Sequence, residues 1–422
     1  MKIEAATRLR KTKIKADWWT DLGKEGQDTY ITEHPQSKKA KEKFEKDGEE
    51  GEKPEDKKSV SEKPKQKPLA PGKPLAHFAQ SKDDPAITAD KVYSNFSDDD
   101  VQEMKDKVKE AMRLEPSDKK FTDKAGNYSP ERLKLHQDII SSVLSPEKIK
   151  AATPPKGTKP TFVVLGGRGG SGKSAFTHDE HTGEPAKVNE FDSKKFLTLD
   201  ADAVKQLLDP PYEGWNANQV HEESSFLFDK IADMAQKMGL NIISDATLKS
   251  DKMGPVLQGL IDQGYEVEGH YMFLPRQKAA SRACGRYLKK GKESRGRLVP
   301  PEVILGNTQN EANFDKLKPL FKKWSAYNND VAKGEDPQLI DHSDYASKTE
   351  ANVIRKVMAA KSNPKADAWE NDPYLDYPNA KRAEKVANES NQSLYQLGIK
   401  PEQIKDEHER AAYIAWINKN EN

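Results

Sequence analysis

The chain has 422 residues, more than a single domain of about 150 residues usually requires. It is 34% hydrophobic and 33% charged, with a mean hydropathy of −0.95, so part of it is expected to be solvated and without a core. Lys and Arg (70) balance Asp and Glu (69), so net charge predicts neither a nucleic-acid nor a membrane partner. A single cysteine, Cys284, and the lack of a long apolar run predict no disulfide, no cysteine-rich zinc site, no membrane span and a cytoplasmic location.

The first 84 residues contain little that can form a core. Residues 1–33 are predicted to be a short aromatic, amphipathic module, either a satellite helix or, through its paired tryptophans, a docking segment. The run DWWTDLGKEGQDTYITEHPQSK at residues 17–38, which extends past this module, resembles a terminal module that recurs in bacteriophage-encoded proteins. Between Lys38 and Lys67, eleven lysines and nine acidic residues accompany three apolar ones, so residues 34–84 are predicted to be a disordered charged and proline-rich linker. The interleaved acids favour a solvated spacer over a nucleic-acid-binding tail.

Residues 85–155 are predicted to be a helical lead-in. Apolar residues of the stretch 101–114 fall on one helical face, with Asp98 or Asp99 as the expected cap. A second helix is expected after Ser129, a plausible N-cap, with Pro130 at the first helical position, where its missing amide costs nothing. Prolines and a glycine between 154 and 160 then place a boundary near residue 156.

Residues 156–344 alternate strand-like and helix-like patterns. Strands are predicted at 161–165, 196–199, 241–244, 266–274 and 337–341, and helices at 219–238 and 251–263. This alternation predicts an α/β fold, a parallel sheet with helices on both faces. Residues 345–422 are predicted to be a helical C-terminal extension.

The run GRGGSGKS at 167–174 satisfies G-x-x-x-x-G-K-[ST], and it follows a strand and precedes a probable helix. Glycines let the loop turn its amides toward phosphates, Lys173 neutralises the terminal phosphates, and the Ser174 hydroxyl can ligate magnesium. A nucleoside triphosphate with Mg²⁺ is therefore the expected ligand, and the motif alone does not separate a kinase from a GTPase, a motor or a switch. The expected nucleotide-binding residues, which are the ATP-binding residues of a kinase, are Gly167, Gly169, Gly170, Ser171, Gly172, Lys173, Ser174 and Ala175.

Two aspartates follow the second predicted strand, at the edge where open α/β sheets place their chemistry. One of Asp200 and Asp202 can take a proton from an acceptor hydroxyl while the other tunes it or assists the metal. The alternative for each is a helix-capping role, which is the stronger alternative for Asp200.

A basic segment at 276–297 carries nine Lys or Arg and one acidic residue among 22 positions. It is either a generic polyanion-binding patch or a lid whose arginines close over the transferred phosphoryl group, with glycines as hinges.

These motifs, in their order and approximate spacing over residues 161–330, resemble the zeta toxin family of P-loop kinases. The matching runs are GSGKS, LDADAVK, NIISDATLK, Gly264 and Tyr265 before YMFLP, Arg286 with Tyr287, and Arg297 before Pro300. The resemblance implies transfer of the γ-phosphoryl group of ATP to a hydroxyl of a small acceptor, such as the sugar of UDP-N-acetylglucosamine. Where the family commonly has Glu-Gly-Thr, this chain has Asp245-Ala246-Thr247, which bears on the acceptor more than on the transfer.

The resemblance also implies roles for single residues. Lys173 and Ser174 fall on the ATP and magnesium positions, and Asp202 on the catalytic base. Thr247 falls on a substrate-contacting threonine, while Arg286 and Arg297 fall on two phosphate-stabilising arginines, with Arg295 competing for the last position. The remaining expected substrate contacts are Asp200, His221 and Glu223, and a solvated helix start is the alternative for the last two.

Two other function classes stay open. The first is a phage virion or assembly protein with a vestigial or regulatory nucleotide-binding domain, and the second is a kinase of a polynucleotide end or an antibiotic hydroxyl. Retention of the aspartate, threonine and arginines argues against the first, and the lack of an aromatic and basic groove argues against a polynucleotide. An antitoxin or a phage structural partner, bound through the N-terminal module, is the macromolecular partner that we expect.

Overall fold

The computed structural model describes residues 75–78, 80, 84–179, 184–208, 213–289, 297–332, 334–343 and 380–420. These residues belong to one compact unit, Leu69–Asn422. The expected N-terminal module, most of the expected linker and the start of the C-terminal extension lie outside the described residues. Among the described residues, none of the helices combines the length and the apolar character needed to cross a bilayer.

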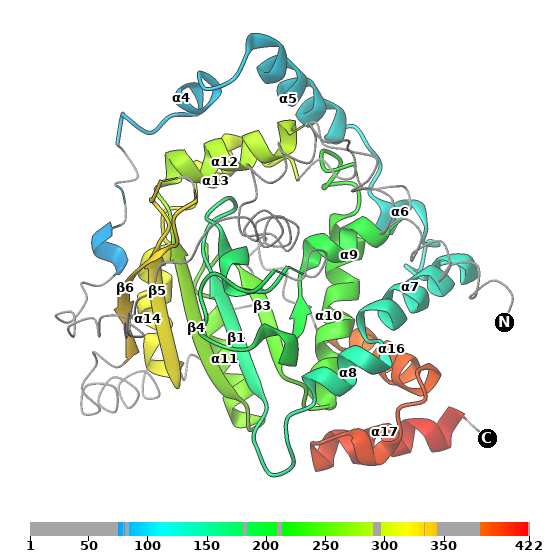
Figure 1. Cartoon of the computed structure of the whole chain (residues 1–422). Helices are drawn as coiled ribbons and strands as arrows, with labels where there is room; N and C mark the ends of the chain where they lie inside the picture. Colours follow the sequence, from blue (N-terminus) through cyan, green and yellow to red (C-terminus); the bar gives the residue numbers. More distant parts are fainter. Residues whose placement is uncertain are drawn as a thin grey trace, which may run out of the picture. The chain divides into compact units, whose positions relative to one another are not determined.

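A six-stranded sheet forms the centre of the unit (Figure 1), with the strand order β2-β3-β1-β4-β5-β6. The first five strands are parallel, and β6 pairs with β5 in the antiparallel direction. The sheet is therefore of the P-loop kinase type, with an antiparallel strand added at one edge. The strands are β1 Thr161–Gly166, β2 Leu197–Leu199, β3 Ile242–Ala246, β4 Glu266–Phe273, β5 Lys323–Asn328 and β6 Gln338–His342.

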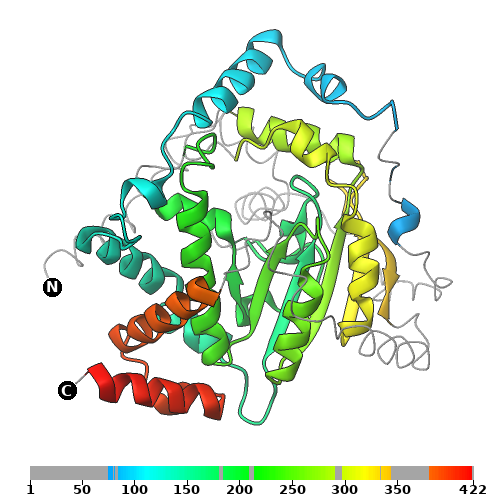
Figure 2. The same cartoon turned by 180° about the vertical axis from the view of Figure 1, so that it is seen from behind.

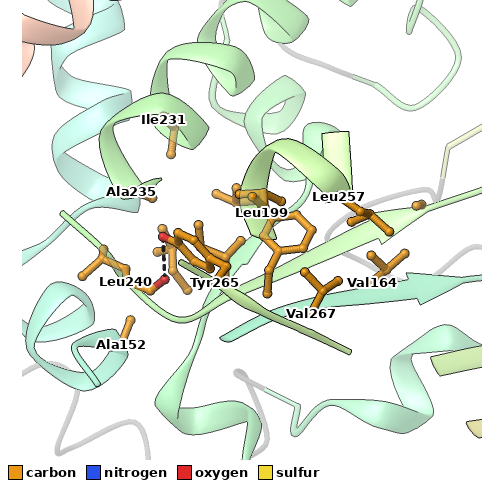
Figure 3. Packing of buried hydrophobic residues seen from close by; sticks show 14 of the residues in the cluster. Ala152, Val164, Leu199, Ile231, Ala235, Leu240, Leu257, Tyr265 and Val267 are labelled. Atoms are coloured by element: carbon orange, nitrogen blue, oxygen red, sulfur yellow. Dashed lines mark hydrogen bonds between the residues drawn. The ribbon is translucent and has the colours of Figure 1, made fainter. Parts of the chain in front are cut away.

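One face of the sheet is covered by helices, which lie in front of the strands in Figure 2. The helices whose apolar residues share the large core on this face are α10 His221–Lys237, α11 Met253–Asp262 and α14 Asn310–Leu317. Figure 3 shows part of this core, with Ile231 of α10 and Leu257 of α11 among strand residues. The buried Tyr265 hydroxyl has a hydrogen-bond partner within the core, because it donates to the Leu240 carbonyl at 3.1 Å (Figure 3). The apolar stripes of these helices explain why they pack here.

The other face is covered by the segment after the P-loop. Phe176 and Val188 of this segment pack on Val163, Ile243 and Met272 of the sheet. Instead of the helix expected after the P-loop, the chain makes a single 3-10 turn, Lys173–Phe176, and later a second one, Ser193–Lys195. The helix is interrupted because the Ala175 carbonyl accepts the Val188 amide at 2.9 Å, and because the following Thr-His-Asp run favours helices poorly.

The predicted lead-in is helical. Its second long helix begins as expected, because Ser129 Oγ accepts the Arg132 amide and Pro130 occupies the first position. The first long helix begins one residue earlier than expected, since Ser97, not Asp98 or Asp99, caps it by accepting the Asp100 amide. The helices are α4 Ala89–Tyr93, α5 Asp98–Ala111, α6 Ser117–Lys120, α7 Pro130–Val143 and α8 Pro146–Ala152. Ile139 and Ile140 of α7 join the core of the sheet, so this region is continuous with the α/β fold.

The ends of the described chain also contribute to the core. The 3-10 turn Leu75–Phe78 lies within the segment expected to be a disordered linker, yet Leu75 is fully buried, so this part of the expectation is wrong. Asp315 holds the turn by accepting the amides of Leu75 and Ala76. The expected C-terminal helices are present as α16 Ala380–Gln396 and α17 Glu407–Asn420, joined by a 3-10 turn at Pro401–Gln403.

The remaining helices lie near the carboxyl ends of the strands (Figure 1). They are α9 Ala201–Leu207, α12 Arg276–Leu288 and α13 Pro301–Leu305, and a 3-10 turn, Lys318–Leu320, follows α14.

Candidate active site

The phosphate loop connects β1 to the 3-10 turn at Lys173. Gly167, Gly170 and Gly172 have φ values of 141°, 85° and 93°, a region that side chains other than glycine rarely adopt. A Cβ atom on Gly170 would also collide with the Ala279 carbonyl of α12, and one on Gly172 with the Asn329 amide. Glycine is therefore required at 170 and 172 by both conformation and space.

The Lys173 ammonium group lies across the loop that it closes. It donates to the Gly167 carbonyl at 2.8 Å and to the Arg168 carbonyl at 3.3 Å. It also pairs at 3.2 Å with Asp245, an exposed carboxylate at the end of the neighbouring strand β3. Ser174 follows Lys173 and is exposed. The loop therefore presents a cation and a hydroxyl beside a carboxylate.

Asp200 directly follows β2 and caps α9, since its Oδ1 accepts the Asp202 amide at 2.8 Å. The capping role considered for Asp200 is thus present. Burial raises the pKa of Asp200, and the carboxylates of Asp202 and Asp245 act in the same direction. Asp200, at the carboxyl end of β2, is therefore close enough to Asp202 and Asp245 for their negative charges to disfavour its ionised form.

Asp202, on the first turn of α9, is held by two cations. Arg297 Nη1 lies 3.0 Å from Oδ1 and 3.3 Å from Oδ2, and Lys205 Nζ lies 3.0 Å from Oδ1. Burial favours a higher pKa for Asp202, but the charges of Arg297 and Lys205 outweigh it and hold the pKa below its ordinary value. Burial and the Arg297 charge lower the pKa of Lys205. Asp202 is therefore ionised at neutral pH, as a proton acceptor must be.

The arginines expected in the lid differ in their positions. Arg297 contacts Asp202, as described, whereas Arg295 lies outside the described residues. Arg286 is exposed on α12 and is not among the cations in contact with Asp202. The helix α12 packs against the phosphate loop at Gly170, so Arg286 lies on a helix that contacts this loop.

Thr247 follows β3 and is exposed at the carboxyl edge of the sheet. The next residue, Leu248, has a φ of 58°, the one positive φ among the described non-glycine residues. Such a backbone conformation costs about 1 kcal/mol or more and persists where the surroundings hold it. Here the buried Leu248 side chain and a hydrogen bond from Asn313 to the Leu248 carbonyl hold the turn that presents Thr247.

Glu223 was expected to contact substrate, but its surroundings argue for a structural role. The carboxylate is fully buried and accepts hydrogen bonds from Arg132 at 2.6 and 2.7 Å and from His136 at 2.6 Å. These bonds from α7 satisfy a charge that would otherwise be costly to bury. His221 lies at the start of the same helix and is partly exposed.

The sequence pattern does not predict that Lys205 and Asp245 belong to the site. From the sequence pattern, Lys205 is expected to be a solvent-exposed residue of an amphipathic helix. In the structure it is only 2% exposed, and its ammonium group donates to Asp202. The signal for Lys205 was its spacing, since residues three apart on a helix share a face.

Magnesium requires few protein ligands where phosphates and water supply the rest. Among the described residues, no group of three or more acidic, histidine or cysteine side chains is arranged so that it could bind a metal ion. The exposed Ser174 hydroxyl, next to Lys173 in the phosphate loop, fits a magnesium ion that is bound chiefly through phosphates.

Residues 146–331 match the family model described as Zeta toxin. No curated protein matches the chain in sequence. A structure of the PezAT chromosomal toxin-antitoxin system of Streptococcus pneumoniae aligns with a TM-score of 0.36 and 15% identity, over 65% of this chain and 99% of that chain. The AvrRxo1-ORF1:AvrRxo1-ORF2 complex aligns with a TM-score of 0.41 over 70% of this chain and 87% of that chain, with 17% identity for the sulphate-containing structure and 16% for the one with ATP.

Proposed function

Because residues 146–331 match the zeta toxin family model, we propose that the protein is an ATP-dependent phosphotransferase that moves the γ-phosphoryl group to a hydroxyl of a small acceptor. The family consists of kinases, and the fold is of the P-loop kinase type. The acceptor that we propose is a nucleotide sugar such as UDP-N-acetylglucosamine.

The observation that carries the proposal is the meeting of three strand ends. The phosphate loop follows β1, Asp200 and Asp202 follow β2, and Asp245 is the last residue but one of β3. These strands are neighbours in the order β2-β3-β1. Lys173 pairs with Asp245, and Arg297 pairs with Asp202. A cationic phosphate cradle and an ionised carboxylate thus share one edge of the sheet, which is what phosphoryl transfer to a hydroxyl requires.

In the proposed reaction, Lys173 and the loop amides hold the phosphates of ATP. Asp202 accepts the proton of the acceptor hydroxyl while that oxygen bonds to the γ-phosphorus. The bond between the γ-phosphorus and the bridging oxygen breaks, and ADP leaves. Arg297 neutralises Asp202 in the structure, so it must turn from the carboxylate to the phosphoryl group for the carboxylate to act as a base. Arg286 is the second proposed phosphate-stabilising group.

A bound magnesium ion would neutralise charge on the phosphates, and Ser174 is the residue proposed to hold it. Thr247, presented by the turn at Leu248, is the proposed acceptor contact. An antitoxin is the proposed protein partner, a phage structural protein is the alternative, and the cytoplasm is the proposed location.

The experiment is incubation of the full chain with γ-labelled ATP, Mg²⁺ and separate acceptors: UDP-N-acetylglucosamine, other nucleotide sugars, nucleosides, an aminoglycoside and oligonucleotides with a free 5′ hydroxyl. Label on a nucleotide sugar supports the proposal in full. Label on another small molecule would replace the proposed acceptor, and measurable ATP affinity without label on any acceptor would favour a regulatory nucleotide-binding role.

A further inference from the structure

The first turn of α14 carries three polar side chains that solvent does not reach. Asn310 and Glu311 are fully buried and Asn313 is 4% exposed, beside the apolar Phe314. Burial of amides and carboxylates is costly unless each group has a partner. Their partners lie in two loops far away in the sequence and, for Glu311, also on strand β4.

Glu311 binds the phosphate loop through Arg168. The guanidinium group of Arg168 forms two bonds with the Glu311 carboxylate, one through Nη1 and one of 2.7 Å through Nη2. Its Nε donates to the Asn307 carbonyl at 2.9 Å, just before the helix. Tyr271 of β4 donates to the same carboxylate at 3.0 Å. Bidentate pairs of this kind fix geometry as well as contributing energy.

Arg168 is a direct part of the cradle, because its own carbonyl accepts Lys173 Nζ at 3.3 Å and the Ser171 amide at 3.0 Å. Since the side chain is 2% exposed, it points away from solvent and into the protein. The motif itself leaves this position unspecified. Glu311 therefore fixes the first turn of the loop from the inside.

Asn310 and Asn313 bind the other loop. Asn310 Nδ2 donates to the Thr247 carbonyl, and Asn313 Nδ2 donates to the Leu248 carbonyl at 3.0 Å. These bonds lie on either side of the strained Leu248 and fix the backbone that carries Thr247.

We propose that Asn310, Glu311 and Asn313 form a positioning clamp, which sets the distance between the phosphate loop and the Thr247 loop. The clamp residues do not touch the reacting atoms. They act through Arg168 on the nucleotide side and through the Thr247 and Leu248 carbonyls on the acceptor side. This inference rests on the proposed function for its catalytic meaning, whereas the two mechanical couplings exist independently of the acceptor.

The test uses the full chain with Glu311→Gln, Asn313→Ala and the control Asp315→Asn. Asp315 lies on the same helix but binds the turn at Leu75 and Lys318, outside the clamp. Hydrogen exchange is measured without ligand, and ATP affinity is measured by calorimetry with Mg²⁺. We expect Glu311→Gln to speed exchange in residues 166–174 and to weaken ATP binding roughly tenfold. Asn313→Ala should speed exchange in residues 245–250 and leave ATP affinity within about twofold, and Asp315→Asn should do neither.

Equal exchange in the two loops for the clamp variants and the control would overturn the clamp, whatever the protein binds. A wild-type chain without ATP affinity would overturn the proposed function, while the exchange experiment would still decide the couplings. If Glu311→Gln does not fold, Tyr271→Phe removes one bond to Glu311 and keeps the ring in place. It should speed exchange in residues 166–174 by a smaller factor, and unchanged exchange there would count against the clamp.

Discussion

Arg297 and Asp202 form a direct ion pair across the edge of the sheet, with Nη1 3.0 Å from Oδ1. The two side chains are 34% and 36% exposed, so both remain accessible to a ligand. Lys205 approaches the same carboxylate oxygen from within the protein and is nearly buried. The carboxylate therefore keeps one fixed cation and one that can turn toward a phosphoryl group.

The first prediction concerns Asp202 as the base. Asp202→Asn keeps the size of the side chain and removes its ability to accept a proton, so transfer should fall by about 10²-fold or more. ATP affinity should stay within a few-fold, because the phosphate cradle is untouched. Rates with γ-labelled ATP and the identified acceptor measure the first effect, and calorimetry measures the second.

The matched control for Asp202 is Asp192→Asn, which removes the carboxylate that caps a 3-10 turn and pairs with exposed Lys195. It should transfer phosphate at nearly the wild-type rate. Transfer by Asp202→Asn at the rate of this control would remove Asp202 from the mechanism.

The second prediction separates Arg297 from Arg295. Arg297→Gln removes a positive charge that holds the pKa of Asp202 down, so that pKa should rise. As the pH falls, Asp202 in this variant takes up its proton at a higher pH than in the wild type, and the base is lost. The acidic limb of the kcat/KM profile should therefore move to higher pH. The rate at neutral pH should also fall, by about 10²-fold, if Arg297 stabilises the transition state. Arg295→Gln serves as the control and should leave the acidic limb in place, and a shift caused by Arg295→Gln alone would reverse the assignment.

The third prediction uses two glycines with similar backbone conformations. Gly170 and Gly157 have φ values of 85° and 83°, but a Cβ atom meets Ala279 only at Gly170. Gly157→Ala should therefore cost about 1 kcal/mol of unfolding free energy from strain and leave ATP affinity unchanged. Gly170→Ala should in addition displace the phosphate loop and weaken ATP binding by about tenfold or more. Calorimetry and urea unfolding distinguish the two effects, and equal ATP affinity in both variants would show that the loop tolerates the side chain.

Local signals made much of the fold predictable. The strand β1 was found because its apolar residues are bounded by proline and glycine, and the start of α7 was found because Ser129 and Pro130 act within the helix that they begin. In contrast, the sequence analysis does not predict β5, because its run KWSAYN is short and has no β-branched residue, and it becomes a strand by pairing with β4. The sheet supplies the signal that the segment itself lacks.

For the candidate site, too, the sequence carries the features that are local. The motif predicts a phosphate loop because its residues are neighbours in the sequence. The roles of Glu223 and Glu311 depend on partners that the chain brings from far away, such as Arg132 and Arg168. A charged residue with such a partner has the same local pattern as a solvated one, and only the folded chain separates the two cases.

The last prediction concerns Glu223 and pH. Burial alone would raise the pKa of this carboxyl, but hydrogen bonds from His136 and Arg132 lower it from 4.5 to about 2. A group with a lowered pKa in the folded state stabilises that state above pH 4.5, and the stabilisation is lost as the pH falls toward 2. Glu223→Gln should therefore reduce the free energy of unfolding by about 3 kcal/mol at pH 7, and the difference from wild type should shrink between pH 4.5 and 2. Urea unfolding across this range measures the difference.

Glu222→Gln is the control, since Glu222 is about half exposed and lies 3.9 Å from Arg382. It should change the free energy of unfolding by less than about 1 kcal/mol at every pH. A gap for Glu223→Gln that stays constant as the pH falls would mean that neutral packing, not the buried charge, joins α7 to α10.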